Sequence, residues 1–429
     1  MHKLTKEQND VVFCNKPRIY INAGAGTGKT STILTSIAQR IEEAVPPSNI
    51  LVLAYNKKIQ QEIQKKVPRN VLVCTFHAFA KKELKRYMQK VPDLLSPEET
   101  EALIIRAKKE TKTKGKSEDF VQAVLAAREN PSYLKKFKPE YRTVYERYGS
   151  LLKETHRFDF AKLIRKLIFV LKKDEVFLKE LQSRYTHIYI DEFQDISRKR
   201  LKLLECLTSE RTHLFCVGDS DQSIYGWNGI DEKNVEIAIK ILKLRVFNLT
   251  RSYRLPTKIV CAVNQLLKHN QNPLRKSLTS AKKADGIIKV LSFSKGEEEI
   301  SFIKQKIKAL RQKGILDKDI ALLFRVKKMC TEYKNCLQVN CYFSTVHQAK
   351  GLEFKYVFVV GAEDGLFPCI PNMNKLSEKE CAVKMREERR VFAEAITRAS
   401  KGVYITHLNN CLRKNRIATP SPFLSELKL

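Results

Sequence analysis

The sequence lacks the features that mark secreted, membrane-spanning and repeat proteins. No run approaches the ~18 to 20 apolar residues of a transmembrane helix, and the N-terminus has no basic segment followed by an apolar one. We therefore expect a soluble, intracellular protein with no membrane partner. The sequence also has no internal repeat and no low-complexity linker, so its domains are expected to be packed neighbours.

The 11 cysteines show neither a disulfide framework nor the spacing of a metal site. Several lie in apolar stretches such as VLVCTF and LFCVGD, which favours reduced thiols in a core. Cys330, Cys336 and Cys341 are irregularly spaced and have no fourth ligand nearby, whereas structural zinc sites usually have four. We expect no disulfide and no zinc site.

Acidic residues are scarce relative to basic ones. The chain has 47 Asp and Glu against 80 Lys and Arg, and the formal net charge of +33 is spread along its length. Such an excess attracts polyanions, of which nucleic acid is the commonest. Because 43% of the residues are apolar, the sequence predicts a globular protein with a basic surface rather than a disordered polyelectrolyte.

Short apolar runs alternate with amphipathic helical patterns in two blocks. Near-continuous apolar strands separated by helices indicate parallel sheets covered on both faces, so we expect an α/β fold. The first block has candidate strands at 18–23, 49–55, 70–76, 187–192 and 213–219, and the second at 244–250, 287–293, 319–325, 356–362 and 401–407.

A Lys-rich segment from about 78 to 186 interrupts the first block and has the pattern of helices. Within SPEETEALIIRAKKE, Ser96 is a candidate N-cap and Glu99 completes a capping box. The segment is predicted to be an inserted helical subdomain. A chain of 429 residues is long enough for two or three such units.

The stretch INAGAGTGKTSTIL follows the first candidate strand and opens a helix, which is the context of a phosphate-binding loop. Glycine lets backbone N–H groups approach phosphate oxygens, while the following lysine reaches the β- and γ-phosphates and the threonine hydroxyl holds Mg²⁺. The strict pattern begins with glycine, where this chain has Ala23. The predicted ATP-binding residues are Ala23, Gly24, Ala25, Gly26, Thr27, Gly28, Lys29 and Thr30.

YIDEFQD, residues 189–195, places two carboxylates at the end of another candidate strand. Asp191 is predicted to anchor Mg²⁺ together with Thr30, and Glu192 to orient and deprotonate the attacking water. Alone, such a pair is more often the charged first turn of a helix. In one sheet with a phosphate-binding loop, it predicts a site that hydrolyses a nucleoside triphosphate.

Nine ordered motifs resemble those of the UvrD/Rep-like superfamily 1 DNA helicases. They are LTKEQNDVV, AGAGTGKT, LAYNKK, TFHAFA, IDEFQD, VGDSDQSIYGWNG, RSYR, TVHQAKGLEFKYVFVVG and ERRVFAEAITRAS, and they extend from residue 4 to about 407. The resemblance implies two RecA-like P-loop domains with parallel sheets. Motor domain 1A would comprise 1–77 and 187–247, a helical insertion 1B would comprise 78–186, and motor domain 2A would comprise 248–429.

The resemblance also implies contacts to the base and ribose of ATP. Gln8 would read the adenine edge, Tyr253 would stack on the base, and Glu353 would lie near the ribose. Without the phosphate-binding loop downstream, LTKEQ would simply be a capped helix start. The family often has an arginine where this chain has Ser31, a departure that affects base selectivity.

By the same resemblance, three residues would act at the γ-phosphate. Gln222 would sense it, and Arg254 and Arg398 would compensate its charge in the transition state. Surface charge is the commoner role of an arginine in a basic protein, and it is the role expected of Arg389 and Arg390.

A third group matches family positions that contact single-stranded DNA, where polar groups suit the backbone and aromatic faces stack on bases. These residues are Tyr55, Asn56, Thr75, Phe76, His77, Tyr225, Trp227, Thr345 and His347. Packing remains the alternative for a lone His or Phe at a strand end and for Trp227, the only tryptophan. The basic runs 135–138 and 197–202 suit either phosphate contacts or solvated helix faces.

Only 19 residues, Val326 to Ser344, stand where larger family members carry a helical insertion, subdomain 2B. We therefore expect a compact ATP- and Mg²⁺-dependent DNA helicase or translocase, monomeric, acting on single-stranded DNA and single-strand/duplex junctions, with 3′-to-5′ polarity implied by the resemblance. Repair, recombination and replication all use such motors. The alternative is a nucleic-acid-stimulated ATPase that remodels or regulates without processive unwinding. A P-loop kinase or GTPase would not explain the second block, and a catalytically dead binding protein would not explain the complete set of ATPase residues.

Overall fold

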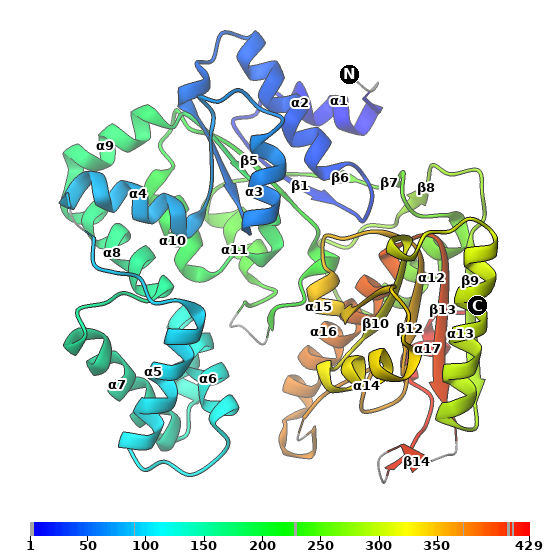
Figure 1. The fold of residues 1–429 in the computed structure, drawn as a ribbon. Helices are drawn as coiled ribbons and strands as arrows, with labels where there is room; N and C mark the ends of the chain where they lie inside the picture. The colour runs from blue at the N-terminus through cyan, green and yellow to red at the C-terminus, as the bar shows by residue number, and fades with distance from the viewer. Residues whose placement is uncertain (1–3, 90, 227–229, 372, 410–411, 414–415) are drawn as a thin grey trace. The chain divides into compact units, whose positions relative to one another are not determined.

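The computed structural model describes residues 4–89, 91–226, 230–371, 373–409, 412–413 and 416–429 (Figure 1). By their internal contacts these residues form two compact units. The N-terminal unit comprises the chain up to Asn22, then Lys29–Asp219 and Tyr225–Leu249. The C-terminal unit comprises Ala23–Gly28, Ser220–Ile224 and Thr250–Leu429. The domain boundaries proposed from the sequence remain a proposal.

A six-stranded sheet forms the core of the N-terminal unit, in the order β3-β2-β4-β5-β1-β6. Its strands are β1 (Arg18–Ala23), β2 (Ile50–Ala54), β3 (Leu72–Thr75), β4 (His187–Ile190), β5 (His213–Gly218) and β6 (Arg245–Leu249). The pairs β1–β5, β5–β4, β4–β2 and β2–β3 are parallel. Every residue of β2 and β4 is buried, as expected of apolar strands covered on both faces.

The prediction that 244–250 belongs to the second block is wrong, because β6 joins the first sheet at its edge beside β1. Its residues are mostly exposed, with Leu249 alone buried. An apolar pattern predicts that a strand forms but not which sheet it joins, since that choice depends on partners distant in the sequence.

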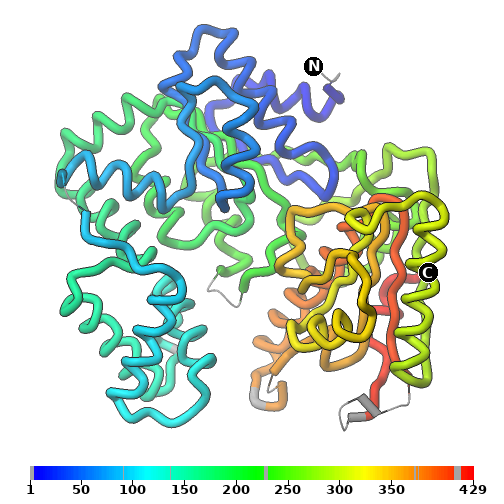
Figure 2. The backbone as a smooth tube through the Cα atoms, in the orientation of Figure 1, coloured from blue at the N-terminus to red at the C-terminus, as the bar shows by residue number. Residues whose placement is uncertain are grey.

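Helices surround this sheet and extend into a helical part (Figure 1). They are α1 (Lys6–Val12), α2 (Lys29–Glu42), α3 (Lys57–Gln64), α4 (Phe76–Met88), α5 (Pro97–Glu110), α6 (Ser117–Glu129), α7 (Pro139–Glu154), α8 (Phe160–Lys173), α9 (Glu175–Arg184), α10 (Arg198–Leu207) and α11 (Asn234–Ile241). The predicted capping box is confirmed, since Ser96 Oγ accepts from the Glu99 N–H at 3.1 Å and Glu99 Oε2 accepts from the Ser96 N–H at 2.7 Å. Helices α5, α6 and α7 share a core of their own around Ile104, Phe120 and Tyr148, and the cyan and teal trace in Figure 2 shows them grouped together.

Asp159 joins three of these helices. Its carboxylate caps α8 by accepting from the Lys162 N–H at 2.6 Å, and it receives two hydrogen bonds from the Arg128 guanidinium of α6 at 2.7 and 2.8 Å. The Tyr148 hydroxyl of α7 donates to it at 3.1 Å. Because Arg128 and Asp159 are both buried, their charges depend on this pairing.

The C-terminal unit contains a second sheet of five strands in the order β11-β10-β12-β13-β9, and all its neighbouring pairs are parallel. Its strands are β9 (Ile287–Phe293), β10 (Ile320–Phe324), β11 (Tyr342–Thr345), β12 (Phe354–Val360) and β13 (Ala399–Leu408). Its helices are α12 (Thr257–Leu267), α13 (Gly296–Gln312), α14 (Lys327–Leu337), α15 (Val346–Ala349), α16 (Glu378–Thr397) and α17 (Pro422–Glu426). Two-residue strands β7 (Arg251–Ser252) and β8 (Thr279–Ser280) form a separate parallel pair. The predicted α/β fold with parallel sheets is confirmed.

The ten cysteines that the structure describes are all free thiols. Only Cys74, Cys216 and Cys330 are buried, so the expected core position applies to these three, while Cys261 and Cys336 are exposed. Over the same described ranges, no three His, Cys, Asp or Glu side chains form a group able to hold a metal ion. Within that part of the chain, too, every helix is too short or too polar to cross a bilayer.

Candidate functional site

The phosphate-binding loop connects β1 to α2. Gly26 and Gly28 have φ angles of 73° and 88°, in the left-handed region that favours glycine. The Thr27 hydroxyl donates to the Gly24 carbonyl oxygen at 2.9 Å and closes the turn. Because α2 begins at Lys29, the first N–H groups of a helix and its positive dipole end follow the loop directly. This geometry suits a phosphate anion.

The loop Ala23–Gly28 belongs to the C-terminal unit, and residues 252–254 of that unit lie directly against it. The Ser252 hydroxyl donates to the Ala25 carbonyl oxygen at 2.7 Å, and the Tyr253 N–H donates to the Gly26 carbonyl oxygen at 2.8 Å. A Cβ atom placed on Gly26 would lie 2.4 Å from Arg254 Cβ and 2.8 Å from Ser252 Oγ. Glycine is therefore required at position 26 by close approach as well as by its φ angle, and Arg254 leaves the main chain beside the loop.

Arg254 and Arg398 are the two arginines predicted to act on the γ-phosphate. Arg254 Nε donates to Glu353 Oε2 at 2.7 Å, while Arg398, at the C-terminal end of α16, donates to the Leu352 carbonyl oxygen at 2.9 Å and pairs with Glu394 at 3.2 Å. Burial lowers the pKa of Arg254, and the neighbouring positive charge of Arg398 lowers it further. Two guanidinium groups held this close favour binding of an anion with several negative charges.

The carboxylates Asp191 and Glu192 follow β4, as predicted. Asp191 is 4% exposed, and its Oδ1 atom accepts no hydrogen bond from the residues that the structure describes. Burial and the neighbouring Glu192 raise the pKa of Asp191 to about 7, against the opposing effect of Lys29. A buried carboxylate oxygen without a donor is suited to a hard cation, so Asp191 and the Thr30 hydroxyl at the start of α2 fit the proposed Mg²⁺.

Gln8 and Tyr253 are the residues predicted to contact the base. Gln8 lies in α1 and forms a capping box with Thr5, in which Gln8 Oε1 accepts from the Thr5 N–H at 3.1 Å and Thr5 Oγ1 accepts from the Gln8 N–H at 3.2 Å. The capping interpretation of LTKEQ is therefore correct, and it fixes the Gln8 amide without excluding contact with adenine. The ring of Tyr253 is exposed, as a stacking face has to be.

The predicted DNA-contacting residues include an aromatic group at the ends of β2 and β3. The rings of Tyr55 and Tyr225 stack with centroids 5.7 Å apart and planes 19° apart. The Arg200 guanidinium lies 5.1 Å from the Tyr55 ring centroid and 5.5 Å from that of Phe76. Phe76 is buried, so its ring packs inside the unit beside Arg200. Trp227 lies outside the described residues.

Asn56, Thr75 and Thr345 precede helices at strand ends. Asn56 Oδ1 accepts from the Ile59 N–H at 3.0 Å and caps α3, and Thr75 Oγ1 accepts from the Ala78 N–H at 3.2 Å and caps α4. Thr345 precedes α15, and its hydroxyl donates to Gln348 Oε1 at 3.3 Å. These positions place the side chains at the carboxyl edges of the sheets, where ligands of parallel sheets bind.

A cavity of about 250 Å³ adjoins His77 and Tyr55 within the N-terminal unit. His77 Nε2, Thr100 Oγ1 and Glu129 Oε2 line or border it and have no hydrogen-bond partner in the described part of the chain. Burial, and next the charge of Arg200, lower the pKa of His77 to about 4, so its ring is neutral at pH 7. Sequence reasoning missed Thr100 and Glu129, since neither belongs to a motif.

The basic run 197–202 is a solvated helix face only in part, because Lys202 is exposed whereas Lys199 is buried. Lys199 is 6% exposed and Ser197 is buried, while Arg200 covers the aromatic group described above. Burial lowers the pKa of Lys199 to about 8, although the nearby carboxylate of Glu129 opposes the shift.

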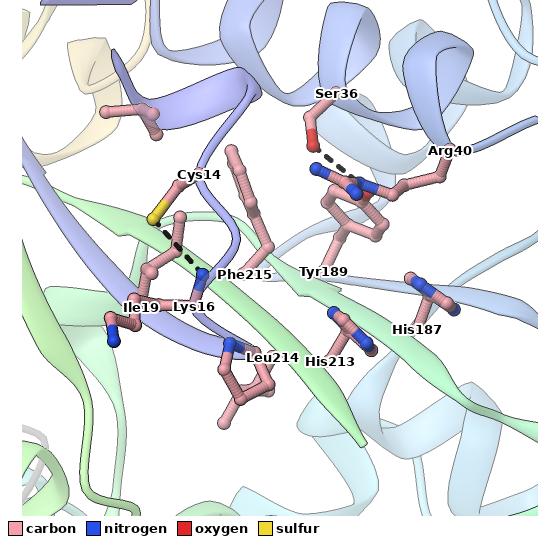
Figure 3. Close-up of a pocket in the computed structure, with 12 residues that line it drawn as sticks. Cys14, Lys16, Ile19, Ser36, Arg40, His187, Tyr189, His213, Leu214 and Phe215 are labelled. Atoms are coloured by element: carbon pink, nitrogen blue, oxygen red, sulfur yellow. Dashed lines mark hydrogen bonds between the residues drawn. The ribbon is translucent and has the colours of Figure 1, made fainter. Parts of the chain in front are cut away.

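A second cavity in the N-terminal unit lies at the amino ends of β4 and β5 (Figure 3). Its volume of about 20 Å³ has room for roughly one water molecule, so it is too small for a nucleotide. His187 and His213, opposite each other in the parallel register, stack there with centroids 4.5 Å apart. Burial, followed by His213, lowers the pKa of His187 to about 4.

The expectation that Arg389 and Arg390 are surface charges is wrong. Their exposed fractions are 8% and 5%. The Arg389 guanidinium donates to Glu426 at 2.6 and 2.8 Å and to Asn270 at 2.7 Å, whereas Arg390 Nε donates to the Ser223 carbonyl oxygen at 2.7 Å. The C-terminal half of α16 is buried on all sides from Glu387 to Thr397, and buried guanidinium groups need such partners.

The fold and this site together define the class of protein. Parallel α/β sheets, a phosphate-binding loop between a strand and a helix, and carboxylates at the end of another strand of the same sheet are features of P-loop nucleotide hydrolases with RecA-like domains. Comparison with known families then gives the family. The model described as the UvrD/REP helicase N-terminal domain matches residues 4–241, and that described as the UvrD-like helicase C-terminal domain matches 247–341 and 331–410. The chain belongs to the UvrD-like helicase family.

Individual relatives agree with this assignment. The chain is 28% identical over 384 residues to a protein described as a probable DNA helicase II homolog of Mycoplasma pneumoniae, with 79% of this chain and 53% of the relative covered. It is 26% identical over 350 residues to the ATP-dependent DNA helicase PcrA of Staphylococcus aureus, with 76% and 48% covered. It therefore spans about half the length of these relatives. A second Mycoplasma pneumoniae protein, described as a probable DNA helicase, is 25% identical over 455 residues, with 95% and 84% covered.

Proposed function

We propose that this chain is an ATP-dependent DNA helicase or translocase that moves along single-stranded DNA, with the 3′-to-5′ polarity implied by its family resemblance. It would act as a monomer at single strands and single-strand/duplex junctions, in DNA repair, recombination or replication. The observation that carries the proposal is the position of Arg254, which leaves the main chain directly beside Gly26 of the phosphate-binding loop. An arginine supplied from outside the loop is the device by which P-loop motors accelerate ATP hydrolysis.

In this proposal, hydrolysis of ATP to ADP and phosphate uses residues on both sides of the γ-phosphate. Lys29 neutralises the β- and γ-phosphates, and Thr30 and Asp191 would hold Mg²⁺, which would supply further positive charge. Glu192 orients a water molecule and takes its proton as the oxygen attacks phosphorus. Arg254 and Arg398 compensate the charge of the transition state, an effect worth about 10³ to 10⁵ in rate for arginine fingers.

The proposed DNA contact rests on the stacked Tyr55 and Tyr225 and on Arg200. Exposed aromatic faces bind successive bases without regard to sequence, at about 1–3 kcal/mol per base, and cationic groups hold the backbone. The formal net charge of +33 favours the same polyanionic partner. The predicted stacking role of Trp227 stays part of this proposal.

A second candidate is a nucleic-acid-stimulated ATPase that remodels bound complexes without processive unwinding. The observation that favours it is the short connection from Phe324 to Tyr342, which contains α14 and no inserted domain. Larger family members place subdomain 2B at this position, where it contacts duplex DNA. A chain with only one helix there has less surface with which to hold a duplex.

The test is ATP hydrolysis by the full chain with and without single-stranded DNA. We expect strong stimulation by DNA, a steep fall of DNA affinity with rising salt, and loss of hydrolysis in Lys29→Ala. Lys179→Ala is the matched control, because it removes one exposed positive charge of α9 that pairs with the exposed Glu175. Equal hydrolysis with and without a range of DNA and RNA strands would overturn the proposal.

Strand displacement from substrates with a 3′ or a 5′ single-stranded tail separates the two candidates. Displacement that requires a 3′ tail supports the helicase with the proposed polarity. DNA-stimulated hydrolysis without displacement from either substrate supports the second candidate.

A further inference from the structure

The segment that carries Gln222, residues Ser220–Ile224, is held through its main chain. Three consecutive residues of this segment take hydrogen bonds from side chains far away in the sequence. The pairs are Lys350 Nζ to the Gln222 carbonyl oxygen at 2.9 Å, Arg390 Nε to the Ser223 carbonyl oxygen at 2.7 Å, and the His347 ring to the main chain of Ile224. Bonds to the main chain fix where the segment lies and do not use the Gln222 amide.

The start of the segment is held in addition by residues that follow α12. Asn272 Nδ2 donates to Asp221 Oδ1 at 3.0 Å and to Ser220 Oγ at 3.1 Å. Lys276 Nζ lies 3.8 Å from Asp221 Oδ2, and both side chains are buried. A Cβ atom on Gly24 would lie 3.3 Å from Lys276 Cε, so this lysine also borders the start of the phosphate-binding loop.

Among these anchors, Arg390 is the one that helix α16 connects to Arg398. It lies in α16, a helix of 20 residues that begins after the Ser377 capping box and ends at Thr397, with Arg398 as its C-cap. Arg398 follows Arg390 by eight positions, which corresponds to about 12 Å along the helix. Any shift of α16 that follows Arg398 therefore moves Arg390, and with it the carbonyl oxygen of Ser223.

We infer that Arg390 is a positioning residue for ATP hydrolysis, an inference that rests on the proposed function. Through the Ser223 carbonyl oxygen it holds the Gln222 amide in register with Arg398, so that both reach the γ-phosphate together. When the γ-phosphate leaves, Arg398 loses its contact with that anion, and a shift of α16 is passed to residues 220–224. The chain continues from there into Tyr225, whose ring belongs to the proposed DNA-binding group, so Arg390 links nucleotide state to DNA affinity.

The chain offers a matched set of variants for this inference. Arg390→Met removes the donors and keeps an unbranched side chain, and replacing a buried charge with an apolar side chain is often tolerated. Arg390→Lys keeps a cationic donor able to reach the same carbonyl oxygen. Arg389→Met is the control, because Arg389 is the adjacent buried arginine of the same helix but binds Glu426 and Asn270 instead of the Gln222 segment.

Two measurements are made on each full-length variant: kcat and KM for ATP with saturating single-stranded DNA, and DNA affinity with ADP compared with a non-hydrolysable ATP analogue. For Arg390→Met we expect kcat to fall about 10- to 100-fold, as for the loss of one charge-assisted hydrogen bond, with KM changed less than about threefold. The ratio of DNA affinities in the two nucleotide states should approach one. Arg390→Lys should recover part of both quantities, and Arg389→Met should keep both.

The inference is overturned if Arg390→Met keeps its kcat and its nucleotide-dependent DNA affinity, or if Arg389→Met loses them equally. If Arg390→Met fails to fold, Arg390→Gln replaces it: a lowered kcat with unchanged KM supports the inference, and wild-type values of kcat and of the ratio of DNA affinities overturn it. Failure of the proposed function is recognised separately, because it is measured on the unaltered chain. If the unaltered chain hydrolyses ATP at the same rate with and without DNA, the inferred link between nucleotide state and DNA affinity is overturned. The comparison of kcat and KM then decides whether Arg390 is a positioning residue. If the unaltered chain hydrolyses no ATP, both are overturned.

Discussion

Replacement of Gly26 by alanine should disrupt the phosphate-binding loop through two separable effects. The φ angle of 73° places residue 26 in the left-handed region, which costs an alanine about 1–2 kcal/mol. The added Cβ atom would also lie 2.4 Å from Arg254 Cβ and 3.1 Å from the Arg254 main-chain nitrogen, neither of which is the movable end of a side chain. Overpacking of this kind costs a further 1–3 kcal/mol or so, which gives a total of about 2–5 kcal/mol.

Two other glycines separate these effects. Gly314 has a φ angle of 75° but nothing within 4 Å of an added Cβ atom, so Gly314→Ala should lose only the first contribution, about 1–2 kcal/mol. Gly149 lies in α7 with open space around it and no positive φ angle. Gly149→Ala should therefore stabilise the protein by about 0.5–1 kcal/mol, since alanine favours the helix.

The assay is urea denaturation of the three variants, with nucleotide affinity measured on each folded variant by a fluorescent ATP analogue. We expect Gly26→Ala to be the least stable and to lose nucleotide affinity, because the loop and Arg254 have to move apart. Equal stability of Gly26→Ala and Gly314→Ala, with unchanged nucleotide affinity, would refute the close approach of Arg254 to the loop.

Two further predictions concern buried charges in the N-terminal unit. Asp159→Asn should lower the free energy of unfolding by about 3–5 kcal/mol because it leaves the buried Arg128 unpaired, whereas Glu110→Gln, in an exposed pair, should leave the urea midpoint unchanged. His187 has a folded pKa of about 4, below its unfolded value of 6.5, so its contribution is fully present above pH 6.5 and is lost as the pH falls toward 4. His187→Gln should reduce this acid-dependent loss of stability in urea denaturation between pH 7 and 4.5, and an unchanged slope would contradict the burial of that ring.

Motifs and strands whose signals are local could be predicted from the sequence. The phosphate-binding loop is fixed by glycines at set spacing between a strand and a helix, and the Ser96 capping box by two residues three apart. The apolar runs of β2, β4 and β12 are typical of buried strands. In each case the physical cause lies within a few residues of its effect.

Features that depend on distant partners could not be predicted in the same way. Arg390 is buried because the carbonyl oxygen of Ser223, 167 residues earlier, accepts from it, and nothing near Arg390 in the sequence reveals that partner. The membership of β6 in the first sheet depends likewise on β1. Strand β11 was missed because YFST is short and ends in two hydroxyl residues, although it pairs with β10 along its whole length.

Helices α5, α6 and α7 enclose a core of their own, with Ile104, Val124 and Tyr148 fully buried among them. An element whose apolar side chains are satisfied internally can change length, or be exchanged for another, without uncovering the sheet to which it is attached. Evolution can therefore vary this module at little cost to the motor where the buried Arg128–Asp159 pair is kept, in the way that surface insertions are tolerated when they begin and end at neighbouring points. We expect sequence differences among related chains to concentrate in such modules. The loop around Gly26 should remain unchanged, because there is no room for a side chain at that position.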